Sequence, residues 1–240
     1  LTATAISSGR SVTFIQGRSD EPAWEGLKHA GLRTPLRLEH VMASAAIPIL
    51  FPAVPLVGEF FCDGSVGQAA PLAPAIRLGA RAAFVIGLKT RYRDVRPAPA
   101  TQPYPSVAEV SGLLLDTIFQ DQLEADADQL ARINSLLDAL PADTPAPQSL
   151  RPVDLLVMRP RRDLATLSAG LSTTLPKQVR RIVDGIGGRR EGAAEFLSYL
   201  LFEPEFTTQL VELGYEDLGA QWPEIERFFA KLERRADATD

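Results

Sequence analysis

The first sixteen residues alternate between β-branched or aromatic side chains and small ones, as the strands of a half-buried sheet do. The alternating positions are Thr2, Thr4 and Ile6, followed by Val12, Phe14 and Gln16. Ser8-Gly9 lies between the two series and is typical of a turn. The pattern predicts a β-hairpin over residues 1–16. Residues 20–36 are mixed and polar, with Pro22 and Pro35, and predict a loop with at most one helical turn.

The segment "LEHVMASAAIPILFPAV" is rich in small residues and predicts a tightly packed helix. Pro48 should end or kink this helix, because proline removes a backbone donor and clashes with the preceding turn. "EFFCDG" then predicts a short strand that ends in a turn at Gly64. "APLAPAIRLGA" predicts a helix with a proline in its first turn and Gly79 after its last.

"RAAFVIGL" is a continuous apolar run, typical of a strand covered on both faces of a parallel sheet. Strand, helix and strand within 30 residues predict a βαβ unit. The fold class expected is therefore α/β, with a parallel-rich central sheet between two layers of helices. Residues 1–160 would form this core, with a helical excursion over 106–140, and residues 161–240 a helical extension.

The rest of the chain is predicted to be mainly helical. Proline-rich loops at 96–105 and 140–152 flank a helix over 106–139, and "VDLLVMRP" predicts one more strand. Further helices are expected in "LPKQVRRIVDGIGG", "GAAEFLSYLLFEP", "EFTTQLVELGY" and "WPEIERFFAKLERR". The leucine-rich start of helix 106–120, with Leu113, Leu114 and Ile118, suits packing in a core or dimer, and an acyl-chain channel is the alternative.

Composition narrows the function classes. The net charge of −5 argues against a general nucleic-acid partner, because phosphate binding needs a basic face. A single cysteine, Cys62, excludes an internal disulfide and favours a reducing compartment such as the cytoplasm. No apolar run approaches the roughly 20 residues that a membrane-spanning helix needs.

Asp63 is the main candidate for chemistry. Asp-Gly is a common turn dipeptide, so a purely structural role is the first alternative. However, Asp63 follows Phe60 and Phe61, and a carboxylate at the end of a buried strand lies where α/β sheets place their sites. Desolvation there would raise its pKa toward that of a useful base.

Other nucleophiles and ligands are weaker candidates. His29 and His40 are the only histidines, and two histidines with one cysteine at no close spacing do not make a zinc site. His40 is expected to cap its helix or to orient a neighbour. No G-x-S-x-G elbow is present, since Ser65 has the wrong glycine spacing and Ser44 lies inside a predicted helix.

The order of these motifs resembles the carboxy-terminal part of the catalytic domain of the patatin-like phospholipases, in a bacterial branch of the family. The family's A-S-x-A-x-P-x-x-F-P segment is matched from Ala43 to Pro52, and its D-G-[GA] motif by Asp63 and Gly64. Ser65 stands where the family usually has glycine or alanine. The match is most specific over residues 37–88.

The resemblance implies a lipid acyl hydrolase with a Ser–Asp dyad, in which Asp63 takes the proton of the serine and an acyl-enzyme forms. Gly64 would allow the tight turn, and Ser65, Ser44 and Pro48 would shape the site. The oxyanion loop and the nucleophile are expected on an upstream segment of the same protein or on another chain, so the 240 residues alone should be inactive. No cofactor is implied.

The substrate would be a lipid or another acyl ester, with transient contact at a membrane surface. The protein is expected in the cytoplasm or at the periphery of membranes or lipid granules. Two alternatives stay open. An acyltransferase or a polyester esterase would use the same dyad, and a non-catalytic lipid-binding or scaffold module would use none.

Overall fold

A computed structural model describes most of the chain, as two compact units. The described residues are 1–17, 23–48, 50–68, 70–88, 90, 104–141, 150–169, 181, 198–199 and 201–237. The first unit comprises Leu1–Ala83 and Asp121–Val153, and the second comprises Phe84–Gln120 and Asp154–Asp240. Helix α3 (Val107–Asp138) contributes residues to both.

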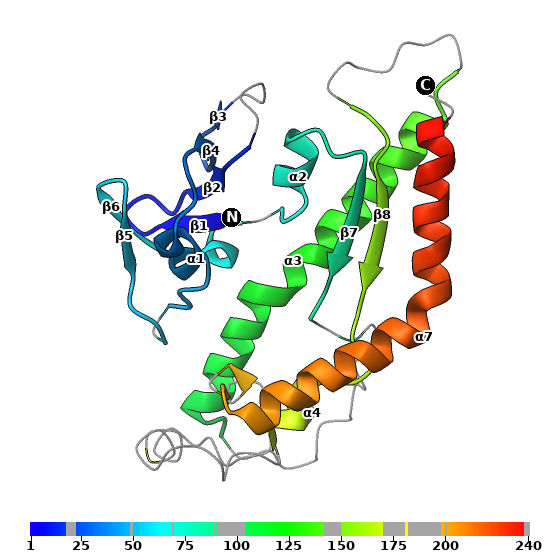
Figure 1. Ribbon diagram of the computed structural model, residues 1–240. Helices are drawn as coiled ribbons and strands as arrows, with labels where there is room; N and C mark the ends of the chain where they lie inside the picture. Colours follow the sequence, from blue (N-terminus) through cyan, green and yellow to red (C-terminus); the bar gives the residue numbers. More distant parts are fainter. Residues whose placement is uncertain are drawn as a thin grey trace. The chain divides into compact units, whose positions relative to one another are not determined.

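The first unit contains a six-stranded sheet in the order β3-β4-β2-β1-β6-β5 (Figure 1). Its strands are β1 (Thr2–Ala5), β2 (Ser11–Ile15), β3 (Trp24–Glu25), β4 (His29–Arg33), β5 (Val54–Leu56) and β6 (Glu59–Asp63). Only β2 and β4 pair in parallel; the other four pairings are antiparallel. The mixture of helices and strands is as expected, but this sheet is mostly antiparallel rather than parallel-rich.

The amino-terminal hairpin is confirmed, whereas the loop predicted over residues 20–36 is wrong. β1 and β2 pair with Thr2 opposite Thr13, and Gly9 adopts a positive φ of 67° in the turn. The polar segment that follows instead supplies two strands, and β4 pairs along its full length with β2. Strand β4 is only partly buried, and its sequence shows little alternation of apolar and polar residues. Its pairing with the buried strand β2 therefore determines its conformation.

Helix α1 (Leu38–Ser44) packs against β1, β5 and β6. It ends four residues before Pro48, as the sequence predicts. Ala43 and Ala46 are fully or almost fully buried in a core that Phe14 and Phe61 dominate. Small side chains suit this segment because the carbonyl of Ala46 lies within hydrogen-bond distance of the N–H of Asp63 on β6. Packing alone is therefore a sufficient explanation for the alanines of this segment.

The elements after β6 are found where the sequence predicts them, but their environment differs. A short 3₁₀ helix, η1 (Gly64–Val66), is followed by α2 (Ala73–Arg77), and Gly79 has a positive φ of 96° after it. Strand β7 (Ala82–Ile86) pairs with β8 (Asp154–Met158) and not with β6. The expectation of a buried strand is wrong, since the side chain of Ile86 is 74% exposed.

In the second unit, β7 and β8 run in the same direction, with α4 (Leu164–Ala169) and the long helix α7 (Pro204–Asp237) beside them (Figure 1). The sequence predicted two separate helices over 205–235. They form one, with Pro223 inside it. Most of the helices predicted over 175–204 lie outside the described residues.

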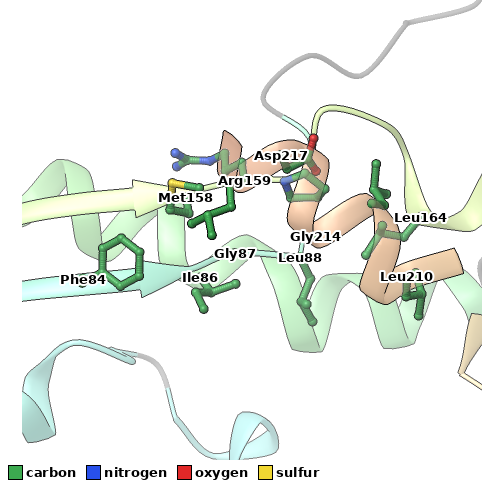
Figure 2. Close-up of a pocket in the computed structure, with 13 residues that line it drawn as sticks. Phe84, Ile86, Gly87, Leu88, Met158, Arg159, Leu164, Leu210, Gly214 and Asp217 are labelled. Carbon is green, nitrogen blue, oxygen red and sulfur yellow. The ribbon is translucent and has the colours of Figure 1, made fainter. Parts of the chain in front are cut away.

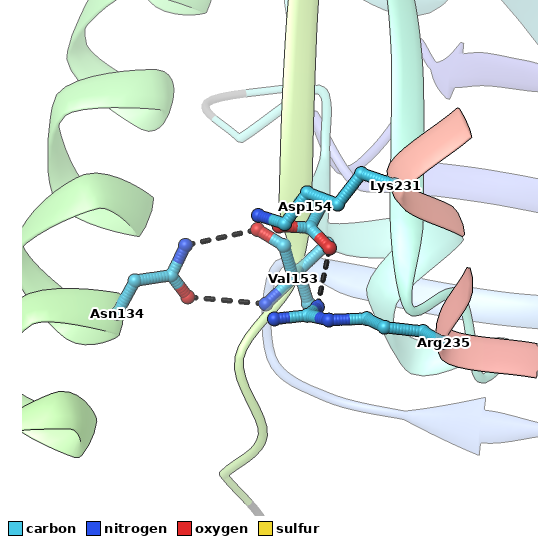
Figure 3. Close-up of polar contacts among 5 residues, drawn as sticks. All are labelled: Asn134, Val153, Asp154, Lys231 and Arg235. Carbon is cyan, nitrogen blue, oxygen red and sulfur yellow. Dashed lines mark hydrogen bonds and ion pairs between the residues drawn. The ribbon is translucent and has the colours of Figure 1, made fainter. Parts of the chain in front are cut away.

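Helix α7 is attached to both strands. Phe229 packs on Phe84 of β7 with ring centroids 6.1 Å apart. At the start of β8, the half-accessible cations Lys231 and Arg235 both bind the carboxylate of Asp154 (Figure 3). Because this carboxylate is only 14% exposed, its two ion pairs fix the end of α7 more firmly than ordinary surface pairs would.

In the first unit, the side chain of Asn134 holds the backbone of Val153 through two hydrogen bonds. The Asn134 amide donates to the carbonyl of Val153 at 2.9 Å and accepts from its N–H at 3.1 Å (Figure 3). This side chain therefore satisfies the backbone of a fully buried residue in the way that a neighbouring strand would.

Candidate functional site

Asp63 is the last residue of β6 and is paired with Ala3 on the central strand β1. Its exposed fraction is only 8%, so the carboxylate lies at the edge of the core and not at a loop tip. Phe61, two residues earlier, is buried, and Phe60 points outward and is 59% exposed. The expectation that both phenylalanines bury the strand is therefore correct for Phe61 and wrong for Phe60.

Hydrogen bonds from two other elements hold the backbone of Asp63. Its N–H donates to the carbonyl of Ala46 at 2.9 Å. Its carbonyl accepts from the hydroxyl of Thr4, on β1, at 2.8 Å. The first of these bonds joins the two motif segments directly, because Ala46 belongs to the small-residue segment that follows α1. Two stretches that are well separated in the sequence thus form one corner.

The turn after Asp63 can be made only by glycine. A Cβ atom on Gly64 would overlap the carbonyl oxygen of Thr2. The same Thr4 hydroxyl also lies 3.2 Å from the carbonyl of Gly64 and accepts from the N–H of Gly67 at 3.0 Å. Thr4 therefore clamps both ends of η1 against β1. We refer to Thr4, Ala46 and residues 63–67 as the Asp63 corner.

The carboxyl group of Asp63 has a raised pKa. Burial raises it, because desolvation disfavours the charged form, and hydrogen bonds from the backbone and side chain of Ser65 partly oppose this. The bond from the Ser65 N–H to Oδ1 is 2.9 Å long and is typical of a turn begun by aspartate. Burial, followed by the charge of Asp63, also raises the pKa of the Cys62 thiol. The Asp63 corner therefore combines an aspartate turn with a carboxyl group whose pKa is raised.

The remaining predicted residues lie around this corner in different roles. His40 caps α1, since its Nδ1 accepts from the Arg37 N–H at 3.0 Å, and its buried ring packs edge-on against Phe14. Ser44 and Pro48 are half-buried in the segment that holds Ala46. Within the described part of the chain, Ser44 is not a hydrogen-bond partner of Asp63. His29 lies on β4, where it pairs with Ser11 and takes no part in the corner.

Sequence reasoning did not identify Thr4. The only available signal is a threonine in the middle of a strand whose neighbours are apolar or small, because a buried hydroxyl needs partners. The hairpin prediction places Thr4 on a strand, but its partners are Asp63, Gly64 and Gly67, far along the chain. Local patterns do not reveal such long-range pairs.

Among the described residues, no three histidine, cysteine, aspartate or glutamate side chains come together. No described helix is both long and apolar enough to cross a bilayer. No protein-family model, no curated protein and no solved structure matches the chain.

Proposed function

We propose that the chain supplies the acid–base half of a patatin-like lipid acyl hydrolase, which cleaves carboxylic esters through a Ser–Asp dyad. Asp63 is the general base that takes the proton of the serine. The observation that carries the proposal is the buried carboxylate at the end of β6, with a raised pKa and a backbone held from two sides. A carboxylate needs such an environment because it is otherwise a weak base toward an alcohol.

The proposal requires a serine from outside these 240 residues, since they contain no G-x-S-x-G elbow. That serine belongs to an earlier segment of a longer chain or to another chain, together with the donors of the oxyanion hole. The protein acts on lipids or other acyl esters in the cytoplasm, or at a membrane or lipid-granule surface.

Two measurements on native material test the proposal. Intact-mass analysis should detect either a longer chain or a co-purifying segment. A fluorophosphonate probe should label a serine outside these 240 residues. Labelling of Ser65 or Ser44 would instead assign the nucleophile to the described corner and overturn the division of roles.

Substitution in the complete protein tests the base. Asp63→Asn should lower the turnover of a p-nitrophenyl ester by about 10²-fold or more, because a positioned general base contributes this much. The matched control is Glu59→Gln, which removes a carboxylate from the same strand at a half-buried position where it accepts from Ser7. Turnover that survives Asp63→Asn would remove Asp63 from the mechanism.

A further inference from the structure

A partly open cavity of about 350 Å³ lies in the second unit, where β7 and β8 end against α7 (Figure 2). Ile86 and Leu88 line it from the β7 end, Met158 from the β8 end, Leu164 from α4, and Leu210 and Leu213 from α7. All of these side chains are aliphatic or thioether groups. Phe84 and Pro160 add further apolar surface, and Arg159 and Asp217 are the charged residues of the lining. The wall therefore offers mainly dispersion contacts.

The two charged residues of the lining, Arg159 and Asp217, already take part in interactions within the protein. Asp217 is 7% exposed, and its Oδ2 accepts from the N–H of Arg161 at 3.1 Å. The amide of Gln221 donates to the carbonyls of Arg159 and Asp217 at 3.1 and 3.2 Å. These bonds tie α7 to the segment after β8. The polar residues thus build the end of the cavity, and a ligand inside it would meet hydrocarbon.

We infer that this cavity binds a single aliphatic chain of a lipid. Ligand pockets commonly measure roughly 300–1,000 Å³, so this one suits one chain and is too small for a whole diacyl lipid. A nucleotide, sugar or peptide would need several convergent polar groups, which the walls do not offer. The site recognises the chain and not the head group, and it does not depend on the role proposed for Asp63.

Gly214 makes the inference testable. It lies in the interior of α7 and lines the cavity, and a Cβ atom at this position would meet nothing within 4 Å. A leucine here can therefore fill the cavity without displacing the backbone. Gly219 provides a matched control, because it lies on the same helix, is equally open and does not line the cavity. Both substitutions also remove a helical glycine.

The experiment is calorimetric titration of the purified protein with straight-chain alcohols from butan-1-ol to dodecan-1-ol, and with dodecanoic acid, below the concentrations at which they self-associate. Affinity should rise about fourfold per methylene before it levels off, as expected for progressive burial of the chain. Dodecan-1-ol and dodecanoic acid should bind alike, with one molecule per chain. Tight binding of the acid alone would overturn the inference, because it would show recognition of the head group.

The variants decide whether the cavity is the site. Gly214→Leu should weaken binding about tenfold or more, and Gly219→Leu should leave it within about twofold. Asp63→Asn should also leave it unchanged, so the outcome is separable from the proposed hydrolase. Absence of saturable binding, or equal binding by both glycine variants, would refute the inference. The inference would also be refuted if the cavity served contact between copies of the chain. In that case Gly214→Leu would abolish a dimer in sedimentation without affecting chain binding.

Discussion

The Asp63 corner and the cavity beside α7 both lie where strands end, but they are constructed differently. The corner is saturated with hydrogen bonds and so tightly packed that Gly64 has no room for a methyl group. In the cavity, Gly214 faces open space and the walls are hydrocarbon. The comparison teaches that a glycine can serve opposite purposes: one permits close contact between backbones, and the other leaves volume unfilled.

Substitution of the two glycines by alanine gives the largest contrast. Gly64→Ala should lower the free energy of unfolding by about 3 kcal/mol, because its Cβ meets backbone that cannot move aside. Gly214→Ala should raise it by up to about 1 kcal/mol, since alanine favours the helix and nothing opposes the methyl group. Urea denaturation of the two variants measures both signs. Equal effects would show that the corner is no more tightly packed than the cavity.

The next effect concerns the hydroxyl that clamps the corner. Thr4→Val keeps the shape of a buried side chain but leaves the N–H of Gly67 and the carbonyls of Asp63 and Gly64 without this partner. The free energy of unfolding should fall by about 2 kcal/mol. The control is Thr2→Val on the same strand, whose hydroxyl lies 3.3 Å from that of Thr13. A loss no greater than that of the control would remove Thr4 from the clamp.

The sequence predicted the local elements of both regions better than their assembly. The hairpin, α1, β6, α2 and β8 could be read from periodicity and turn residues, because each depends on neighbours within a few positions. The corner was located through Asp63 and Gly64 for the same reason. Its clamp was missed because Thr4 acts on residues far along the chain.

The errors share a physical cause. β7 has the apolar run of a buried central strand, yet in the described structure it pairs only with β8 and exposes Ile86. β4 has a polar sequence and still forms a strand, because β2 supplies its hydrogen-bond partners. The cavity arises where β7, β8, α4 and α7 meet, and no short motif encodes it. Pairing between distant segments decides each of these features, and periodicity carries no information about it.

The smallest expected effect is electrostatic. It tests whether Asp63 behaves as a buried carboxylate or as an ordinary turn residue. Because folding raises the pKa of Asp63, the folded state holds this proton more tightly than the unfolded state, whose value is about 3.8. The contribution of Asp63 to stability is therefore fully present below about pH 4 and is lost as the pH rises through the raised value. The asparagine of an Asp63→Asn variant cannot ionise, although its amide oxygen can still accept from the Ser65 N–H.

The melting temperature of Asp63→Asn should thus exceed that of the natural protein at about pH 7, and the difference should shrink as the pH falls toward about 4. Glu59→Gln reports the effect of removing one negative charge from the same strand at a less buried position. A difference for Asp63→Asn that is independent of pH, or that reverses sign, would mean that the Ser65 bonds outweigh burial. The corner would then be an ordinary aspartate turn, and the distinction between a carboxylate prepared for proton transfer and one that only shapes the chain would disappear.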